Sequence, residues 1–184
     1  MIGNKIYSLA KELFPINRSI TGLGVRKSLK ILQKINKDLK IKGIPSGTKV
    51  FDWIIPQEWN VDEAWIKDSK NHKIIDFKNN NLHLMGYSLP VSKKITLKDL
   101  KKNLYSIKDK PNAIPYVTSY YKKKWGFCLS FNLLKNLKED IYEVKIKSKF
   151  KKGFLNYGEL IIPGKTKKEI LLSTYICHPS MANN

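Results

Sequence analysis

The chain has 184 residues, of which 42% are hydrophobic and 11% aromatic, and its formal net charge is +20. This length and apolar content suffice for a packed core and exclude an intrinsically disordered chain. No apolar run approaches the roughly 20 residues that cross a membrane, and the amino terminus lacks the charged-then-apolar layout of a secretory signal. The spacing of Cys128 and Cys177 is not that of a disulfide framework. We therefore expect a cytoplasmic protein with reduced thiols and no membrane partner.

The positive charge raises the question of nucleic-acid binding. All but two of the 35 basic residues are Lys, and they are spread along the whole chain. Arg, whose planar fork recognises phosphate and guanine, occurs only as Arg18 and Arg26. We therefore favour a solvated basic surface over a nucleic-acid partner.

Two amphipathic helices are expected at the amino terminus. Apolar residues at helical spacing predict a helix over residues 3–13, which Pro15 ends. A second helix is predicted over residues 21–38, with Ser19 or Thr21 as its N-cap.

Beyond residue 39 the pattern changes to short strands with turn residues between them. Residues 41–77 are rich in Ile, Val, Trp and Phe and are broken by Pro, Gly and Asp, which predicts several strands. Another strand is predicted over residues 82–88. A short helix follows over residues 96–105, with Thr96 as its cap. We interpret residues 41–112 as a β-rich subdomain.

The next segment predicts two more strands and a helix. Residues 125–130 form an apolar run typical of a strand, and a short helix is expected over residues 132–137. Residues 141–148 alternate strictly between apolar and polar side chains, as a half-buried strand does.

The last two predicted strands, over residues 153–162 and 169–176, are joined by a turn, and the second delivers His178 at its carboxyl end. In open α/β sheets, ligands usually bind at that end of the strands, and a neutral imidazole can bind zinc at about 2.0–2.1 Å. Side chains alternate along a strand, so Cys177 is expected to point away from His178 and to lie in the core. His178 is the strongest candidate for chemistry, although a histidine at a strand end is more often structural than a ligand.

Other residues have a structural and a functional interpretation. Trp53, Trp59 and Trp65 fall at six-residue spacing, and either fill a small β core, which we favour, or line a sugar or peptide cleft. Arg18 either holds an anion near the start of a helix or takes part in capping and a buried ion pair. Solvated surface positions are favoured over functional ones for His72, His83, Asp62 and Glu63.

Five phrases follow one another along the chain: LFPINRSITG at 13–22, IPSGTKVFDW at 44–53, PYVTSYY at 115–121, WGFCLS at 125–130 and CHPS at 177–180. Together they resemble a bacterial aminopeptidase-like family of the di-zinc type, classed among domains of unknown function and linked to polysaccharide biosynthesis. The final predicted hairpin is similar to the first strands of the di-zinc aminopeptidase fold. The resemblance extends over essentially the whole chain.

The resemblance implies an α/β fold. This fold would be an incomplete zinc-aminopeptidase-like domain that contains an inserted β-rich subdomain. Residues 1–40 would be the amino-terminal helices of that domain, residues 41–112 the insertion, and residues 113–184 the return to the domain, truncated at the metal site. The implied cofactor is zinc, with His178 as the first metal ligand. Asn184 stands where the family usually has a bridging Asp, and an amide is a weaker ligand than a carboxylate.

The resemblance also implies that the general-base Glu and the remaining ligands lie beyond this chain, so we expect no catalytic residue within it. The predicted function is that of an amino-terminal fragment of a zinc-dependent aminopeptidase-like hydrolase, inactive alone, whose complete form acts on a peptide or another amide-containing substrate. The alternative is a non-catalytic glycan- or protein-binding module associated with polysaccharide biosynthesis. The expected protein partner is a missing carboxyl-terminal portion or a second copy of the chain.

Overall fold

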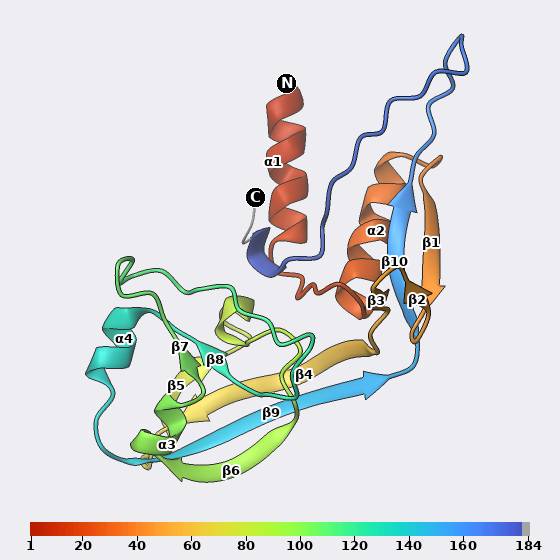
Figure 1. Ribbon diagram of the computed structural model, residues 1–184. Helices are drawn as coiled ribbons and strands as arrows, with labels where there is room; N and C mark the ends of the chain where they lie inside the picture. Colours follow the sequence, from red (N-terminus) through yellow and green to blue (C-terminus); the bar gives the residue numbers. More distant parts are fainter. Residues whose placement is uncertain (182–184) are drawn as a thin grey trace. The chain divides into compact units, whose positions relative to one another are not determined.

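The structure is a computed structural model that describes residues 1–181 (Figure 1). It is a mixture of helices and strands, which confirms that part of the expected fold class. The chain forms two compact units, one of residues 1–58 with the described residues from 151 onward, the other of residues 59–150. The division expected from the sequence, with boundaries after residues 40 and 112, stays a prediction about where an insertion begins and ends.

Both predicted amino-terminal helices form, and both lie in the first unit. Helix α1 spans Ile2–Leu13 and helix α2 spans Leu23–Ile35. Their apolar stripes face a small core, because helices of this length depend on packing more than on intrinsic propensity. The residues of this core are Leu13, Ile16 and Ile31, with Leu9 and Leu32 packed against them.

The predicted N-caps of α2 are wrong. The N-cap is Gly22, which has a positive φ of 96° and makes no side-chain cap hydrogen bond. The two hydroxyls that were expected to cap the helix are buried and bonded elsewhere. Ser19 Oγ donates to the carbonyl of Thr21 at 2.7 Å, and Thr21 Oγ1 donates to the carbonyl of Gln57 at 3.4 Å.

The first unit also contains two small antiparallel strand pairs. Strand β1, Lys40–Pro45, pairs with β10, Phe154–Glu159, in a register that sets Lys40 opposite Glu159. Strands β2, Lys49–Val50, and β3, Trp53–Ile54, form a short hairpin. Helix α2 lies beside the β1–β10 pair (Figure 1).

A buried ion pair links α2 to β10 through the first residue of β4. Arg26 donates two hydrogen bonds to the Glu58 carboxylate, including Nη2 to Oε2 at 3.0 Å, and the Phe154 amide donates to Oε1 at 3.0 Å. Glu58 is only 2% exposed. Burial alone would raise the pKa of the Glu58 carboxyl, but the hydrogen bonds from Arg26 and Phe154 outweigh it and hold the pKa below its ordinary value.

The second unit is built on a four-stranded sheet in the order β5-β4-β9-β6. The strands are β4, Glu58–Lys67, β5, Lys73–Asp76, β6, Val91–Thr96, and β9, Ile141–Lys151. Strand β9 buries alternate residues, as its sequence predicted. Strand β6, which the sequence analysis missed, pairs with β9 along its whole length.

Short elements complete the second unit. Thr96 caps α3, Leu97–Lys101, by accepting a hydrogen bond from the Asp99 amide, as predicted. Two-residue strands β7, Leu104–Tyr105, and β8, Phe127–Cys128, pair in parallel, and α4 spans Phe131–Asn136.

The strand predicted over residues 82–88 is wrong. Residues Asn81–His83 form a 3-10 turn, η1, in which the Asn80 side chain accepts a hydrogen bond from the Leu82 amide. This local bond competes with strand pairing, and only single β-bridges follow at Leu84 and Gly86.

The strand predicted over residues 169–176 is also wrong. The described chain between β10 and the final 3-10 turn contains no helix or strand. Ile170, Leu171 and Leu172 are each about 90% exposed. A strand needs a neighbour to accept its main-chain hydrogen bonds, and none is present along this segment in the described structure.

Within residues 1–181, no helix is both long enough and apolar enough to cross a bilayer.

Replacing Glu58 with Gln should destabilise the protein by about 3 kcal/mol near neutral pH, because it removes the charge that the Arg26 guanidinium faces. The pKa of Glu58 is lowered in the folded state. The wild type should therefore keep its full excess of unfolding free energy over Glu58→Gln at pH values above 4.5, the ordinary glutamate pKa, and lose it progressively as the pH falls below that pKa. Urea unfolding of both proteins between pH 7 and pH 3 checks this. A stability difference that stays constant across the range would contradict it.

Candidate functional site

His178 lies at the end of the extended segment that follows β10. It is half-buried and precedes the 3-10 turn η2, Pro179–Met181, in which Ser180 has a positive φ of 47°. The ring of Tyr175 meets the imidazole edge-on, with centroids 4.9 Å apart. The sequence placed His178 at the tip of a strand, whereas the structure places it at the start of a turn.

The main chain of His178 is bonded to a buried arginine from the opposite end of the sequence. Arg18 Nε donates to the His178 carbonyl at 2.9 Å, and Arg18 Nη1 donates to the carbonyl of Leu13, in the last turn of α1. The Arg18 residue is 3% exposed, and burial lowers the pKa of its guanidinium. Its hydrogen bonds therefore go to main-chain carbonyls, which neither the capping nor the ion-pair interpretation of Arg18 had predicted.

Cys177 and His178 approach one another, contrary to the sequence prediction. Cys177 Sγ lies 3.9 Å from His178 Nδ1. Strand alternation would have pointed the two side chains to opposite faces, but no strand forms here, so the alternation rule does not apply. Burial raises the pKa of the Cys177 thiol. Burial, and then the positive charge of Arg18, lowers the pKa of the His178 imidazole, which favours the neutral ring that a metal requires.

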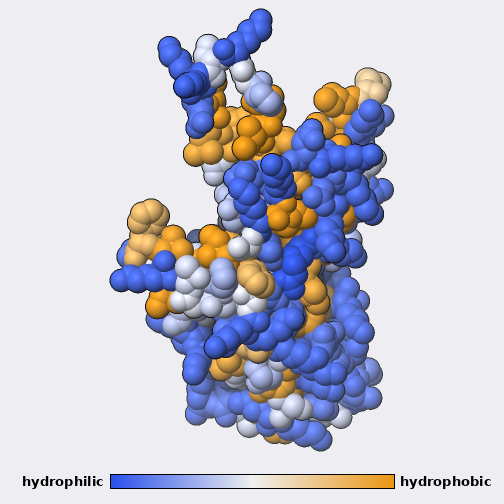
Figure 2. All heavy atoms as spheres, turned by 90° about the vertical axis from the view of Figure 1, so that its right-hand side faces the viewer, coloured by the Kyte–Doolittle hydropathy of each residue, from blue (hydrophilic) through white to orange (hydrophobic). Residues whose placement is uncertain are grey.

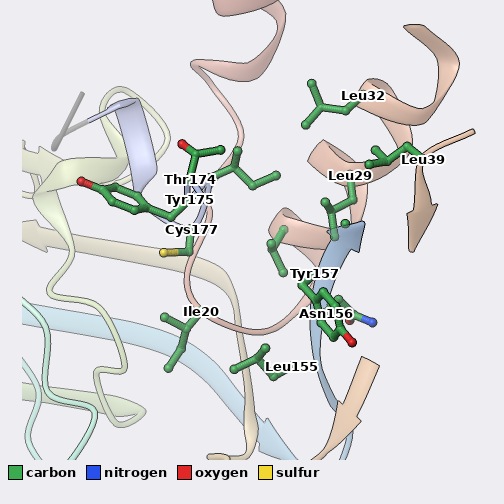
Figure 3. A pocket seen from close by; sticks show the side chains of 13 residues that line it. Ile20, Leu29, Leu32, Leu39, Leu155, Asn156, Tyr157, Thr174, Tyr175 and Cys177 are labelled. Carbon is green, nitrogen blue, oxygen red and sulfur yellow. The ribbon is translucent and has the colours of Figure 1, made fainter. Parts of the chain in front are cut away.

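A pocket of about 380 Å³ lies next to this site in the first unit. Side chains of α2, of β10 and of residues 174–177 surround it, and they are mostly apolar (Figure 3). Leu29 and Leu32 line one side, Leu155 lines another, and Cys177 belongs to the lining while His178 does not. The pocket could take an apolar side chain, but its lining brings no charged group that would recognise a polar ligand.

The residues that the structure describes do not complete a metal site. No group of three His, Cys, Asp or Glu side chains close enough to share an ion occurs among residues 1–181. His178 with the neighbouring Cys177 offers two donors at most, whereas zinc in proteins takes four ligands, of which at least three come from side chains. Asn184, the other predicted ligand, lies outside the described residues.

The three tryptophans do not line one cleft. Trp59 and Trp65 are buried in the second unit, which confirms the core interpretation for both. The indole of Trp59 donates to the Ser88 carbonyl at 3.0 Å. Trp53 belongs to β3 in the first unit.

The remaining polar candidates have structural partners. His72 is exposed and lies 3.1 Å from Asp68, whereas His83 Nδ1 contacts the Cys128 carbonyl at 2.8 Å and is partly buried. Asp62 and Glu63 form ion pairs with lysines of β9, at 3.1 Å with Lys149 and 3.4 Å with Lys145. The surface position predicted for His72 is confirmed, and Asp62 and Glu63 take part in ion pairs, whereas His83 is partly buried in the turn η1 and is not a surface residue of a strand.

Comparison with known proteins identifies the family. Residues 58–149, half of the chain, match the model of the domain of unknown function DUF2172. The chain belongs to the DUF2172 family.

Longer relatives carry names that refer to peptidases. The chain is 53% identical over 182 residues to a Clostridium acetobutylicum protein named "Putative polysaccharide biosynthesis protein with aminopeptidase-like domain". The match includes 99% of this chain and 42% of that protein. A crystal structure of a putative peptidase from Clostridium acetobutylicum matches with a TM-score of 0.94 and 53% identity, over 100% of this chain and 43% of the other. This chain therefore spans less than half the length of these two relatives.

The two thiols should differ sharply in reactivity, because the thiolate is the reactive form. Cys128 is fully buried, and burial raises its pKa to about 12. Cys177 is only half-buried. A maleimide at pH 7.5 should therefore label one thiol of the folded protein, slowly, and the second only after unfolding. Cys177→Ser should abolish the first phase and Cys128→Ser should preserve it; two equal rates in the wild type would contradict the structure.

Proposed function

We propose that this chain is part of a zinc-dependent aminopeptidase-like hydrolase and that His178 is one of the metal ligands. The names of the relatives support the reaction class. The observation that carries the residue assignment is the half-buried imidazole of His178, with a lowered pKa, on a main chain bonded to Arg18.

His178 suits this role, but it needs further ligands. When bound, zinc would supply a Lewis acid for the hydrolysis of an amide. His178 would contribute one nitrogen, and the Cys177 thiol, 3.9 Å from His178 Nδ1, is a second candidate donor. The remaining ligands and the general base would come from polypeptide of the kind that accompanies this region in its longer relatives. On this proposal, residues 1–184 alone do not hydrolyse peptides.

The polypeptide that completes the site would also cover the apolar segment after β10. Exposed apolar side chains gather on both arms of this segment, beside its basic tip (Figure 2). Ile162, Ile170, Leu171 and Leu172 are each more than 80% exposed. Such a cluster is typical of a surface that another polypeptide covers. We propose the rest of the hydrolase as that partner, with a second copy of the chain as its substitute when the rest is absent.

The alternative function, a non-catalytic glycan- or protein-binding module, has less support. Of the three tryptophans proposed to line its cleft, Trp59 and Trp65 are buried. The hydrolase proposal explains more of the observations around His178.

His178→Ala should abolish stoichiometric zinc binding in the full polypeptide that contains these residues, because a catalytic zinc is held by only three protein ligands and would lose one of them. His72→Ala is the matched control, since His72 is exposed and distant in sequence from the site. Metal content after zinc loading and gel filtration, measured by mass spectrometry, gives the result. Equal zinc content in wild type and His178→Ala would refute the assignment of His178.

Residues 1–184 alone should self-associate as their concentration rises, because Leu171 and Leu172 are exposed. The double variant Leu171→Asp/Leu172→Asp should shift sedimentation velocity toward the monomer. Phe51→Asp is the control, because Phe51 is equally exposed, at 93%, but lies on a turn outside the segment. A wild type that stays monomeric at millimolar concentration would contradict the proposed partner surface.

A further inference from the structure

The guanidinium of Arg18 connects two segments that lie 160 residues apart in the sequence. Its Nε bonds the carbonyl of His178, and its Nη1 bonds the carbonyl of Leu13 at the end of α1. A buried cation is costly unless its donors are satisfied, and hydrogen bonds from a charged donor are stronger than neutral ones. The bond to the His178 carbonyl is therefore a strong and directional contact.

Strand pairing does not fix the position of this main chain. Residues 160–177 form no strand, so no ladder of main-chain hydrogen bonds holds them. The segment is largely exposed until it reaches Ile176, and it becomes buried at Pro179. The return of the chain to the first unit thus coincides with the Arg18 bond.

We propose that Arg18 is a positioning residue for the metal ligand His178, an inference that rests on the function proposed above. Arg18 holds the carbonyl of His178 against the end of α1, and this bond determines where the imidazole is presented. Arg18 contacts neither substrate nor metal on this proposal. Its effect on metal binding passes through the main chain of His178.

The geometry requires arginine, and another cationic side chain such as lysine would not suffice. Two carbonyls accept from two different nitrogens of one planar group, Nε and Nη1. The lysine ammonium is a single point charge at the end of a flexible stem and cannot reproduce this fork. Arg18→Lys therefore keeps the charge but loses the two-pronged contact.

The experiment compares Arg18→Lys with Arg26→Lys in the full polypeptide. Arg26 is the matched control, because its side chain bonds the side chains of Glu58 and Asn156 instead of the main chain of His178. Maleimide labelling of the half-buried Cys177 thiol, measured in a Cys128→Ser background and corrected for global stability, should accelerate about tenfold or more in Arg18→Lys and stay unchanged in Arg26→Lys. Zinc affinity, measured by competition with a chelator on folded protein, should fall about 10- to 100-fold in Arg18→Lys only, as for other residues that orient a metal ligand.

The outcomes separate this inference from the function on which it rests. An unchanged labelling rate of Cys177 in Arg18→Lys would overturn the inference, and so would an equal loss of zinc affinity in both variants. Absence of zinc binding in the wild type would refute the proposed function, while the labelling rate would still decide whether Arg18 positions the main chain at His178.

A measurement on the wild type covers the case in which Arg18→Lys does not fold. The Nε–H proton of Arg18 should exchange with water at least about tenfold more slowly than that of Arg26, because Arg18 uses Nε in a partly buried hydrogen bond to a carbonyl, whereas Arg26 bonds its partners through its Nη atoms. Equal exchange of the two Nε–H protons would overturn the inference.

Discussion

The hydrogen bond from Arg18 to the His178 carbonyl is the contact on which the candidate site depends. The bond holds the main chain at the point where the segment after β10 returns to the first unit, next to the edge-on contact of Tyr175 with the imidazole. The bond also explains why arginine occurs inside this unit at all. Removing a guanidinium from water costs free energy, and the hydrogen bonds that it donates to the carbonyls of Leu13 and His178 offset that cost.

The second arginine is used in the same way. Arg26 joins α2 to Glu58 and, through Asn156, to β10. Both arginines of the chain therefore stabilise the first unit from within, and the surface charge is carried by lysine. This distribution supports a solvated basic surface, because the residue type best suited to phosphate recognition is already engaged in internal contacts.

Sequence periodicity predicted the elements whose apolar residues recur regularly at helical or strand spacing. Helices α1 and α2 and strand β9 follow directly from apolar spacing, and the Thr96 cap follows from side-chain chemistry. Periodicity failed where another interaction competed. The predicted strand over residues 82–88 is interrupted by the 3-10 turn Asn81–His83, in which the Leu82 amide donates to the Asn80 side chain, and residues 169–176 have no neighbouring strand with which to pair.

The candidate site was predicted in part. An apolar run followed by His-Pro drew attention to His178, and the family resemblance suggested its role. The contact with Arg18 was beyond prediction from one sequence, because neither the spacing nor the composition of two segments so far apart indicates that they meet. The approach of Cys177 to His178 was missed because it depends on the absence of a strand.

The most direct test is the anomalous scattering of zinc in crystals of the full polypeptide that contains this chain. The account predicts a peak about 2.0–2.1 Å from an imidazole nitrogen of His178, with Arg18 Nε still bonded to the His178 carbonyl. A zinc peak bound entirely by other residues, with the imidazole hydrogen-bonded to main-chain groups, would contradict it.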